Sequence, residues 1–285
     1  MPGNLKARVS WFVLLLVATS LALRSPLAAL IRLSLNDERY SYVALIPVMT
    51  LSLVLFGRKT IFLSPRYCPA IGAPIMFLGA GLAGLAPLSH HLSVVIIELV
   101  LIWIGAFILI FGRHAFMAAG FPIGFLFLMI PLPATALNHL VSFLQHSSAY
   151  MSEALFKALA IPAMRQGLTI SLPGIDIQVA EQCSGIRSSI ALVLASSLAG
   201  YIFLHGTVNR AFLILITIPV VIFKNAVRIV TLSGLALYVD KGFLFGSLHH
   251  FGGLCFSLLD LAIVVPFLLH LQKSEARRRT QRIPA

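Results

Sequence analysis

Three residues of the sequence carry side chains that could act together in covalent catalysis. Cys183 supplies a thiol, Arg228 a guanidinium and His249 an imidazole, with His250 as the adjacent alternative to His249. A nearby cation favours the thiolate form of a cysteine. A thiolate can attack a carbonyl carbon while a histidine moves protons and an arginine stabilises the oxyanion. These residue types predict acyl transfer, provided that the fold brings them together.

Neighbouring residues fit the same interpretation. Arg187 follows Cys183 by four residues and Asn225 precedes Arg228 by three, so on helices each pair would share one face. Ser184 and Gly185 suit a tight entry into a helix directly after the thiol. A thiol at the N-terminus of a helix is also stabilised as thiolate by the positive end of the helix dipole.

The composition predicts that these residues are positioned by a membrane protein. Of 285 residues, 59% are hydrophobic and only 11% are charged, and the mean hydropathy is +0.97. Globular chains carry about 25% charged residues, so this chain could not cover a water-facing surface. Its three cysteines show no CxxC spacing, which argues against a disulfide framework or a zinc ribbon.

Apolar runs predict the membrane-spanning helices, each of which needs about 20 apolar residues. We expect an all-α polytopic protein with a single integral membrane domain over residues 1–285 and a first run that is a retained span. About eight spans are predicted, over residues 9–23, 41–57, 71–88, 92–112, 115–131, 186–204, 211–236 and 251–270.

Basic residues between the runs predict the orientation. With both termini in the cytoplasm, the cytoplasmic segments hold twelve of the 21 lysines and arginines, and the 89–91 loop has none. The tail over 271–285 is then a topology anchor near anionic lipid rather than a nucleic-acid site. The twelve are Lys6, Arg8, Arg58, Lys59, Arg66, Arg113, Arg210, Lys273, Arg277, Arg278, Arg279 and Arg282.

This orientation places the three candidate residues at one membrane face. Cys183 precedes the sixth span and His249 the eighth, both outside. Arg228 lies about 18 residues into the seventh span, a rise of roughly 27 Å, which also reaches the extracytoplasmic end. The preceding segment, 132–185, is predicted to be extracytoplasmic, with an interfacial helix over 137–160 and a β-hairpin around Pro173-Gly174.

Ordinary structural roles are open for the same residues. A lone cysteine often packs as a small hydrophobe, Cys183 could pair with Cys255 in a disulfide, and Arg228 could extend to lipid headgroups. The buried acids Glu98 and Asp260 are expected to be partners of Arg187, Lys224 or Arg228 rather than a proton path. A metal site is a further alternative for the outer histidines, His90, His91, His139, His146, His249 and His250, although no HExxH motif is present.

Three blocks together resemble the exosortase/archaeosortase family. They are Glu181-Gln182-Cys183-Ser184-Gly185-Ile186-Arg187-Ser188, then Asn225-Ala226-Val227-Arg228, then His249 followed four residues later by Gly253. The family shows Cys-Ser-Gly-x-Arg-Ser, Asn-x-x-Arg and His-x-x-x-Gly in this order. The Pro-Gly hairpin before the cysteine and the stretch Leu45-Ile46-Pro47 are also similar.

The resemblance implies a multi-pass cysteine protease/transpeptidase of the cell inner membrane that acts through a thioester. Cys183 would be the nucleophile, Arg228 the oxyanion or thiolate partner and His249 the proton-transfer residue, with no cofactor or metal. Possible supporting residues are His250, Glu181, Ser184, Arg187 and Asn225. Its partners would be membrane lipids and exported proteins with a C-terminal motif such as Pro-Glu-Pro, a transmembrane helix and a basic tail. The alternative function is a transporter or flippase, although no internal repeat supports it.

Overall fold

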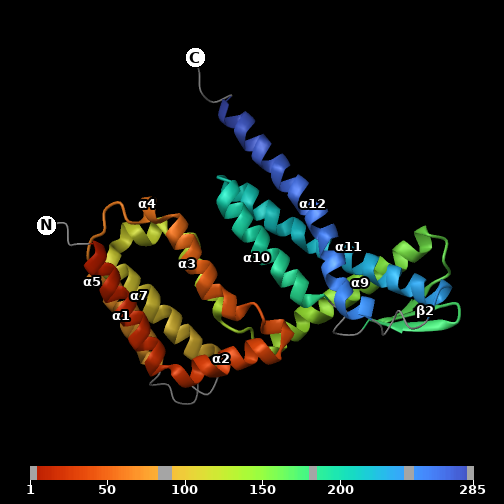
Figure 1. The fold of residues 1–285 in the computed structure, drawn as a ribbon, viewed down its shortest axis with the longest axis horizontal. Helices are drawn as coiled ribbons and strands as arrows, with labels where there is room; N and C mark the ends of the chain where they lie inside the picture. The colour runs from red at the N-terminus through yellow and green to blue at the C-terminus, as the bar shows by residue number, and fades with distance from the viewer. Residues whose placement is uncertain (1–4, 83–91, 180–184, 241–246, 281–285) are drawn as a thin grey trace. The chain divides into compact units, whose positions relative to one another are not determined.

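The computed structural model describes residues 5–82, 92–179, 185–240 and 247–280, with side chains over 256–278 in the last range. The chain divides into two compact units, residues 1–133 and 134–285. Unit 1 is helical throughout its described part (Figure 1). Its elements are α1 Leu5–Ala22, α2 Arg24–Asn36, η1 Glu38–Tyr40, η2 Val43–Leu45, α3 Ile46–Phe56, α4 Arg58–Ile61, α5 Pro69–Leu82, α7 Leu92–Ala118, α8 Gly120–Phe125 and η3 Leu126–Met129.

Small residues let α5 and α7 pack closely in unit 1. A Cβ at Gly72 would lie 2.4 Å from the backbone nitrogen of Leu109, and one at Gly105 would lie 2.6 Å from Met76. Close approach of helix backbones through small residues is typical of helix pairs in membranes. This pairing, with the packed rings of Phe107 and Phe111, forms the core of the unit.

A break at Gly112 changes the course of α7. Gly112 has φ 87° and ψ 174°, and a Cβ there would lie 2.4 Å from the carbonyl oxygen of Arg66. A side chain is therefore excluded by both conformation and space. The expected span over 92–112 is helical and ends at this glycine.

The expected single span over 115–131 is not one continuous helix. The segment consists of the end of α7, α8 and the short 3₁₀ turn η3. It returns toward the start of α7, because the Ser93 hydroxyl donates a hydrogen bond of 2.8 Å to the carbonyl oxygen of Pro131.

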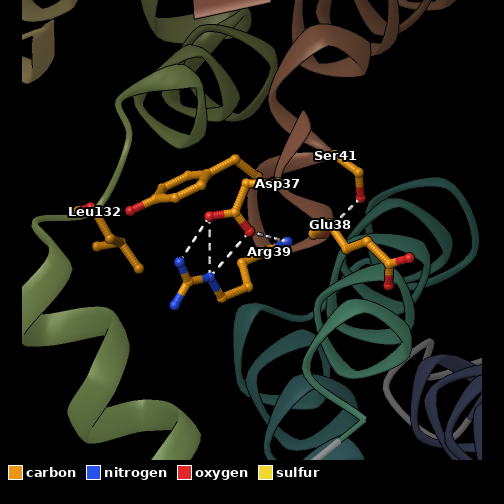
Figure 2. Close-up of polar contacts among 6 residues, drawn as sticks. Asp37, Glu38, Arg39, Ser41 and Leu132 are labelled. Carbon is orange, nitrogen blue, oxygen red and sulfur yellow. Dashed lines mark hydrogen bonds and ion pairs between the residues drawn. The ribbon is translucent and has the colours of Figure 1, made fainter. Parts of the chain in front are cut away.

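The same end of unit 1 contains the turn between α2 and α3. The Tyr40 hydroxyl donates to the carbonyl oxygen of Leu132 at 2.8 Å. The guanidinium of Arg39 forms an ion pair with the carboxylate of Asp37, and Nη2 of Arg39 lies 2.7 Å from Oδ2 of Asp37 (Figure 2). Asp37 Oδ1 also accepts the backbone N–H of Arg39, so this side chain caps η1.

Unit 2 contains one amphipathic helix, a small sheet and three further helices. Its elements are α9 Ala134–Ala158, β1 Met164–Gln166, β2 Thr169–Leu172, β3 Ile175–Gln178, α10 Ile186–Phe203, α11 Thr207–Tyr238 and α12 Ser247–Thr280. The helix expected over 137–160 is α9, and it buries a stripe that includes Val141, Leu144 and Phe156.

The predicted β-hairpin is present and belongs to a three-stranded antiparallel sheet. Leu172 pairs with Ile175 across Pro173-Gly174, and Gly174 has φ 83°. Ile170 and Leu172 of β2 belong to one buried apolar cluster with Phe156 of α9 and Ile229 of α11. The hairpin therefore rests on two helices of its own unit.

The protein is a multi-pass membrane protein with six helices in the described residues that are long and apolar enough to span a bilayer, or seven if the bent pair Gly120–Met129 and Ala134–Ala158 counts as one. Pro69–Leu82 is apolar but shorter. Eight continuous spans and the interfacial position of α9 are not confirmed.

Candidate functional site

Cys183 lies in residues 180–184, outside the described residues, together with Glu181 and Ser184, but both ends of this segment are defined. At its start, the Val179 backbone N–H donates to the carbonyl of Leu168 at 2.9 Å. The Val179 carbonyl accepts from the side-chain amide of Gln145 at 3.0 Å. Its side chain is 1% exposed, in the cluster formed by the sheet, α9 and α11.

At its end, the segment meets α11 through Gly185. Gly185 adopts a left-handed conformation, φ 69°, and a Cβ there would lie 3.3 Å from Oδ1 of Asn225. Its carbonyl accepts the hydroxyls of Ser188 at 2.9 Å and Ser189 at 2.7 Å. The described residues on either side of 180–184 thus contact the sheet, at Val179, and Asn225 of α11, at Gly185.

The helix α10 begins at Ile186, and Gly185 before it has a left-handed conformation. The expectation that Cys183 and Arg187 share a helical face depends on Cys183, which lies outside the described residues. Arg187 itself is exposed in the first turn of α10.

Asn225 is buried at the centre of the arrangement, with 1% of its surface exposed. Its Nδ2 donates to the hydroxyl of Ser148 on α9 at 3.1 Å, and Ser148 is also buried. Arg228 follows one turn later on α11, about 4.5 Å along the axis, and is half-buried. As expected, Asn225 and Arg228 lie three residues apart on one helix.

Lys224, one residue before Asn225, joins α11 to two other helices. Its Nζ donates to the hydroxyl of Ser188 on α10 at 2.6 Å and lies 3.3 Å from Oδ2 of Asp260 on α12. Lys224 is therefore the partner of Asp260, one of the pairings expected from the sequence. Glu98 is buried in α7 and makes no ion pair with any described residue.

Two contacts show that α11 and α12 are antiparallel. Lys224 meets Asp260, and Gly206, before the start of α11, donates its N–H to Glu275 near the end of α12. His249 and His250 lie in the first turn of α12, at the end of the unit that also holds Asn225 and Arg228. Along straight helices, His249 lies about 16 Å from Asp260 on α12, and Arg228 lies about 6 Å from Lys224 on α11. Both distances run toward the same end of the helix pair. The side chains of both histidines are outside the described residues.

The disulfide and metal alternatives fall mainly outside the described part. Cys68 is free, whereas neither Cys183 nor the side chain of Cys255 is described. No three His, Cys, Asp or Glu side chains within the described ranges lie close enough to hold a metal ion. Of the outer histidines, only His139 and His146 have described side chains, so the metal alternative is untested.

Sequence reasoning missed Ser148, and it included Ser188 only as the last residue of the cysteine motif, without predicting its partner. Ser148 and Ser188 connect α9 and α10 to adjacent residues of α11, Asn225 and Lys224. Small hydroxyl residues in apolar helices gave no specific signal, because their partners are far away in the sequence. The resulting network of neutral and charged groups fixes the turn of α11 that holds Lys224 and Asn225, one turn before the guanidinium of Arg228.

Comparison with known proteins gives a family match, and it covers the candidate catalytic residues. The sequence model described as transmembrane exosortase matches residues 32–266. That range includes Cys183, Arg228 and His249, as well as the network from Ser148 to Asp260. No curated protein and no solved structure matches the chain.

Proposed function

The chain belongs to the transmembrane exosortase family, and from this membership we propose that it is a membrane-embedded cysteine protease/transpeptidase. Its substrates would be exported proteins with a C-terminal sorting motif, a transmembrane helix and a basic tail. The substrate helix would lie in the bilayer and present the scissile peptide bond to Cys183. No metal or cofactor takes part in the proposed reaction.

One observation carries the proposal more than any other. The segment containing Cys183 is anchored at Val179 and at Gly185, and the second anchor lies against Asn225. Arg228 is one turn further along the same helix. Gly185, two residues after Cys183 in the sequence, therefore lies against the helix that carries Arg228, which supports the joint assignment of the two residues.

In the proposed reaction the thiol proton of Cys183 passes to the imidazole of His249. The sulfur then attacks the scissile carbonyl carbon, and the guanidinium of Arg228 stabilises the resulting oxyanion. When the C–N bond breaks, the leaving amine takes the proton from His249 and a thioester remains. An amine, hydroxyl or water attacks the thioester while His249 removes its proton, and the thiol is restored.

The proposed location is the cell inner membrane, with cytoplasmic termini and an extracytoplasmic site. In unit 1 the basic residues Arg58, Lys59, Arg66 and Arg113 gather with Arg8 at the Gly112 break, whereas the opposite end has Arg24, Arg32 and Arg39 on α2 and η1, and Arg39 there is paired with Asp37. This asymmetry supports the orientation inferred from the sequence. Eight crossings follow if α5 and the broken segment 113–130 each cross once.

The rival function, a transporter or flippase, would assign the central role to the charged residues in the spans. The contact between Lys224 and Asp260 accounts for both charges as a structural ion pair. A transporter would tolerate loss of the thiol, so replacing Cys183 distinguishes the two functions.

The decisive experiment compares two cysteine variants. Cys183→Ala should abolish cleavage of a co-expressed substrate tail while the protein remains in the membrane. Cys68→Ala is the matched control, since Cys68 is a free cysteine of unit 1, and it should process normally. Mass spectrometry of the wild-type enzyme with the substrate tail should detect an acyl adduct on Cys183. Unchanged processing by Cys183→Ala would refute the proposal.

A further inference from the structure

A polar pocket lies in unit 1 at the Gly112 break, separate from the proposed active site. Its volume is about 330 Å³. Three of its lining side chains can donate hydrogen bonds or carry positive charge, namely Ser64, Arg66 and His114, whereas the Thr60 hydroxyl already donates to the carbonyl of Gly57 at 2.8 Å. No carboxylate lines it.

The break in α7 creates this pocket. Three consecutive carbonyls before Gly112 take partners from outside the helix. The backbone N–H groups of Cys68 and Arg66 donate to Leu109 at 3.0 Å and Phe111 at 3.1 Å. Between them, the buried guanidinium of Arg8 donates to the Ile110 carbonyl at 2.7 Å.

These contacts hold the 66–68 segment beside the bend. Beyond the bend, α7 brings His114 to the pocket that Arg66 lines. The positions of Arg66 and His114 at the pocket are therefore fixed by backbone contacts of the fold.

The charge around the pocket is not balanced by acidic residues. Arg58, Lys59 and Arg113 are exposed on the elements that form it. The acids of unit 1 are Asp37, Glu38 and Glu98. Glu98 lies about 21 Å along α7 from Gly112. Asp37 and Glu38 belong to the turn near Leu132 and Ser93, roughly 28 Å from Gly112 along α7.

We propose that this pocket binds the phosphate group of an anionic phospholipid. A guanidinium binds phosphate oxygens through paired charge-assisted hydrogen bonds, and the Ser64 hydroxyl and the His114 imidazole add further donors. Leu63, which lines the pocket, and Met117, on α7 beyond His114, are exposed by 77% and 64%. These apolar side chains can contact acyl chains, which favours a lipid over a free anion. Basic pockets between membrane helices are known to bind such headgroups.

The test measures lipid binding by the purified full-length protein in a nonionic detergent. Short-chain phosphatidylglycerol is the probe, with phosphatidylcholine and inorganic phosphate as comparisons, and calorimetry is the readout. We expect phosphatidylglycerol to bind at least about tenfold more tightly than either comparison. Equal binding of phosphatidylcholine would overturn an anionic site, and equal binding of phosphate would overturn a lipid site.

Two variants that each remove one positive charge test whether the lipid binds in the pocket. Arg66→Gln should weaken phosphatidylglycerol binding about tenfold or more. Arg58→Gln removes the same charge from an exposed position that does not line the pocket, and should change binding less than about threefold. His114→Gln serves as a second pocket variant if Arg66→Gln lowers the melting temperature. Equal effects of pocket and control variants would show that the charges act only as a diffuse basic surface.

Discussion

The ammonium group of Lys224 lies 3.3 Å from the carboxylate of Asp260 and joins α11 to α12 inside unit 2. Both side chains are nearly inaccessible, with 4% and 3% of their surfaces exposed. The same ammonium donates to Ser188 on α10. Three helices therefore meet one residue away from Asn225, and the ion pair fixes the height of the α11 turn relative to the start of α10.

The ion pair predicts strongly coupled mutational effects. Lys224→Met alone leaves a buried carboxylate without its partner, and Asp260→Leu leaves a buried ammonium. Each should destabilise the protein by about 3–5 kcal/mol. The double variant removes both charges and should recover most of this loss, as melting temperatures in detergent will show. Additive losses would contradict a direct pairing.

An exposed pair provides the control for this cycle. Lys157 lies 2.8 Å from Glu153 on α9, but its side chain is 64% exposed. Lys157→Met should therefore cost less than about 1 kcal/mol. If the ion pair of Lys224 and Asp260 is only structural, the double variant will also process substrate.

Gly185 predicts a separation of stability from activity. Gly185→Ala must adopt φ 69°, which costs an L-residue about 1–2 kcal/mol, and its Cβ must fit 3.3 Å from Asn225 Oδ1. We expect processing to fall at least tenfold, because the displaced backbone carries the segment of Cys183.

The control for this substitution is Gly167→Ala. Gly167 has a similar φ, 62°, but a Cβ there meets nothing within 4 Å. It should lose comparable stability and keep its activity. Equal loss of activity in both variants would indicate a general effect of instability.

The local features of the fold were predictable where the sequence pattern and the local structure agree. Alternating apolar residues around Pro173-Gly174 predicted the hairpin, because side-chain alternation and turn chemistry fix the register together. The run over 186–204 predicted α10, Ile186–Phe203, nearly to the residue. In both cases no distant partner is needed to define the element.

Hydropathy alone was a poor guide where helices break or lie outside apolar runs. The run over 115–131 contains Gly120, Pro122 and Gly124, and it ends near two further prolines, so it forms only short helical pieces. A second helix, α2, begins directly after the run over 9–23, and Pro26 lies in its first turn, where proline is tolerated. The break at Gly112 depends on the carbonyl partners that residues 66–68 supply from a distant segment.

The candidate site was predictable as residue types but not as contacts. Motif spacing selected Asn225, Arg228 and His249, and the antiparallel course of α11 and α12 places these residues toward one end of the helix pair. The hydroxyl partners Ser148 and Ser188 depend on the rotation of α9 and α10 about their own axes. That rotation is set by packing of the whole unit, which a single sequence does not encode in any short pattern.

Glu275 predicts a specific contribution of α12 to stability. Its carboxylate accepts the backbone N–H groups of His205 and Gly206 at 2.8 and 2.9 Å and the side-chain amide of Asn209 at 2.7 Å. Glu275→Ala would leave the start of α11 uncapped and should cost about 2–3 kcal/mol in unfolding experiments. Lys273→Ala, at an exposed position two residues earlier, should be neutral. Similar melting temperatures for the two variants would rule out the capping role.

The Asp37 turn predicts a small acid-dependent loss of stability. The hydrogen bond from the Arg39 side chain holds the pKa of Asp37 below its ordinary value. A carboxyl whose pKa is lower in the folded state stabilises the protein above the unfolded pKa, about 3.9. That contribution is lost as the pH falls through the folded pKa. Asp37→Asn should therefore lower the melting temperature at pH 6 and make less difference at pH 3.

A neighbouring variant separates titration from loss of a turn contact. Ser41→Ala removes the hydroxyl that donates to the Glu38 carbonyl at 2.9 Å, in the same turn (Figure 2). This interaction contains no titrating group, so its effect should be the same at both pH values. Asp37 and Arg39 are half-buried, and the screening by solvent at their partly exposed side chains limits their contribution to about 1 kcal/mol or less. A difference between Asp37→Asn and wild type that grows toward acid would contradict the assigned direction of the pKa shift.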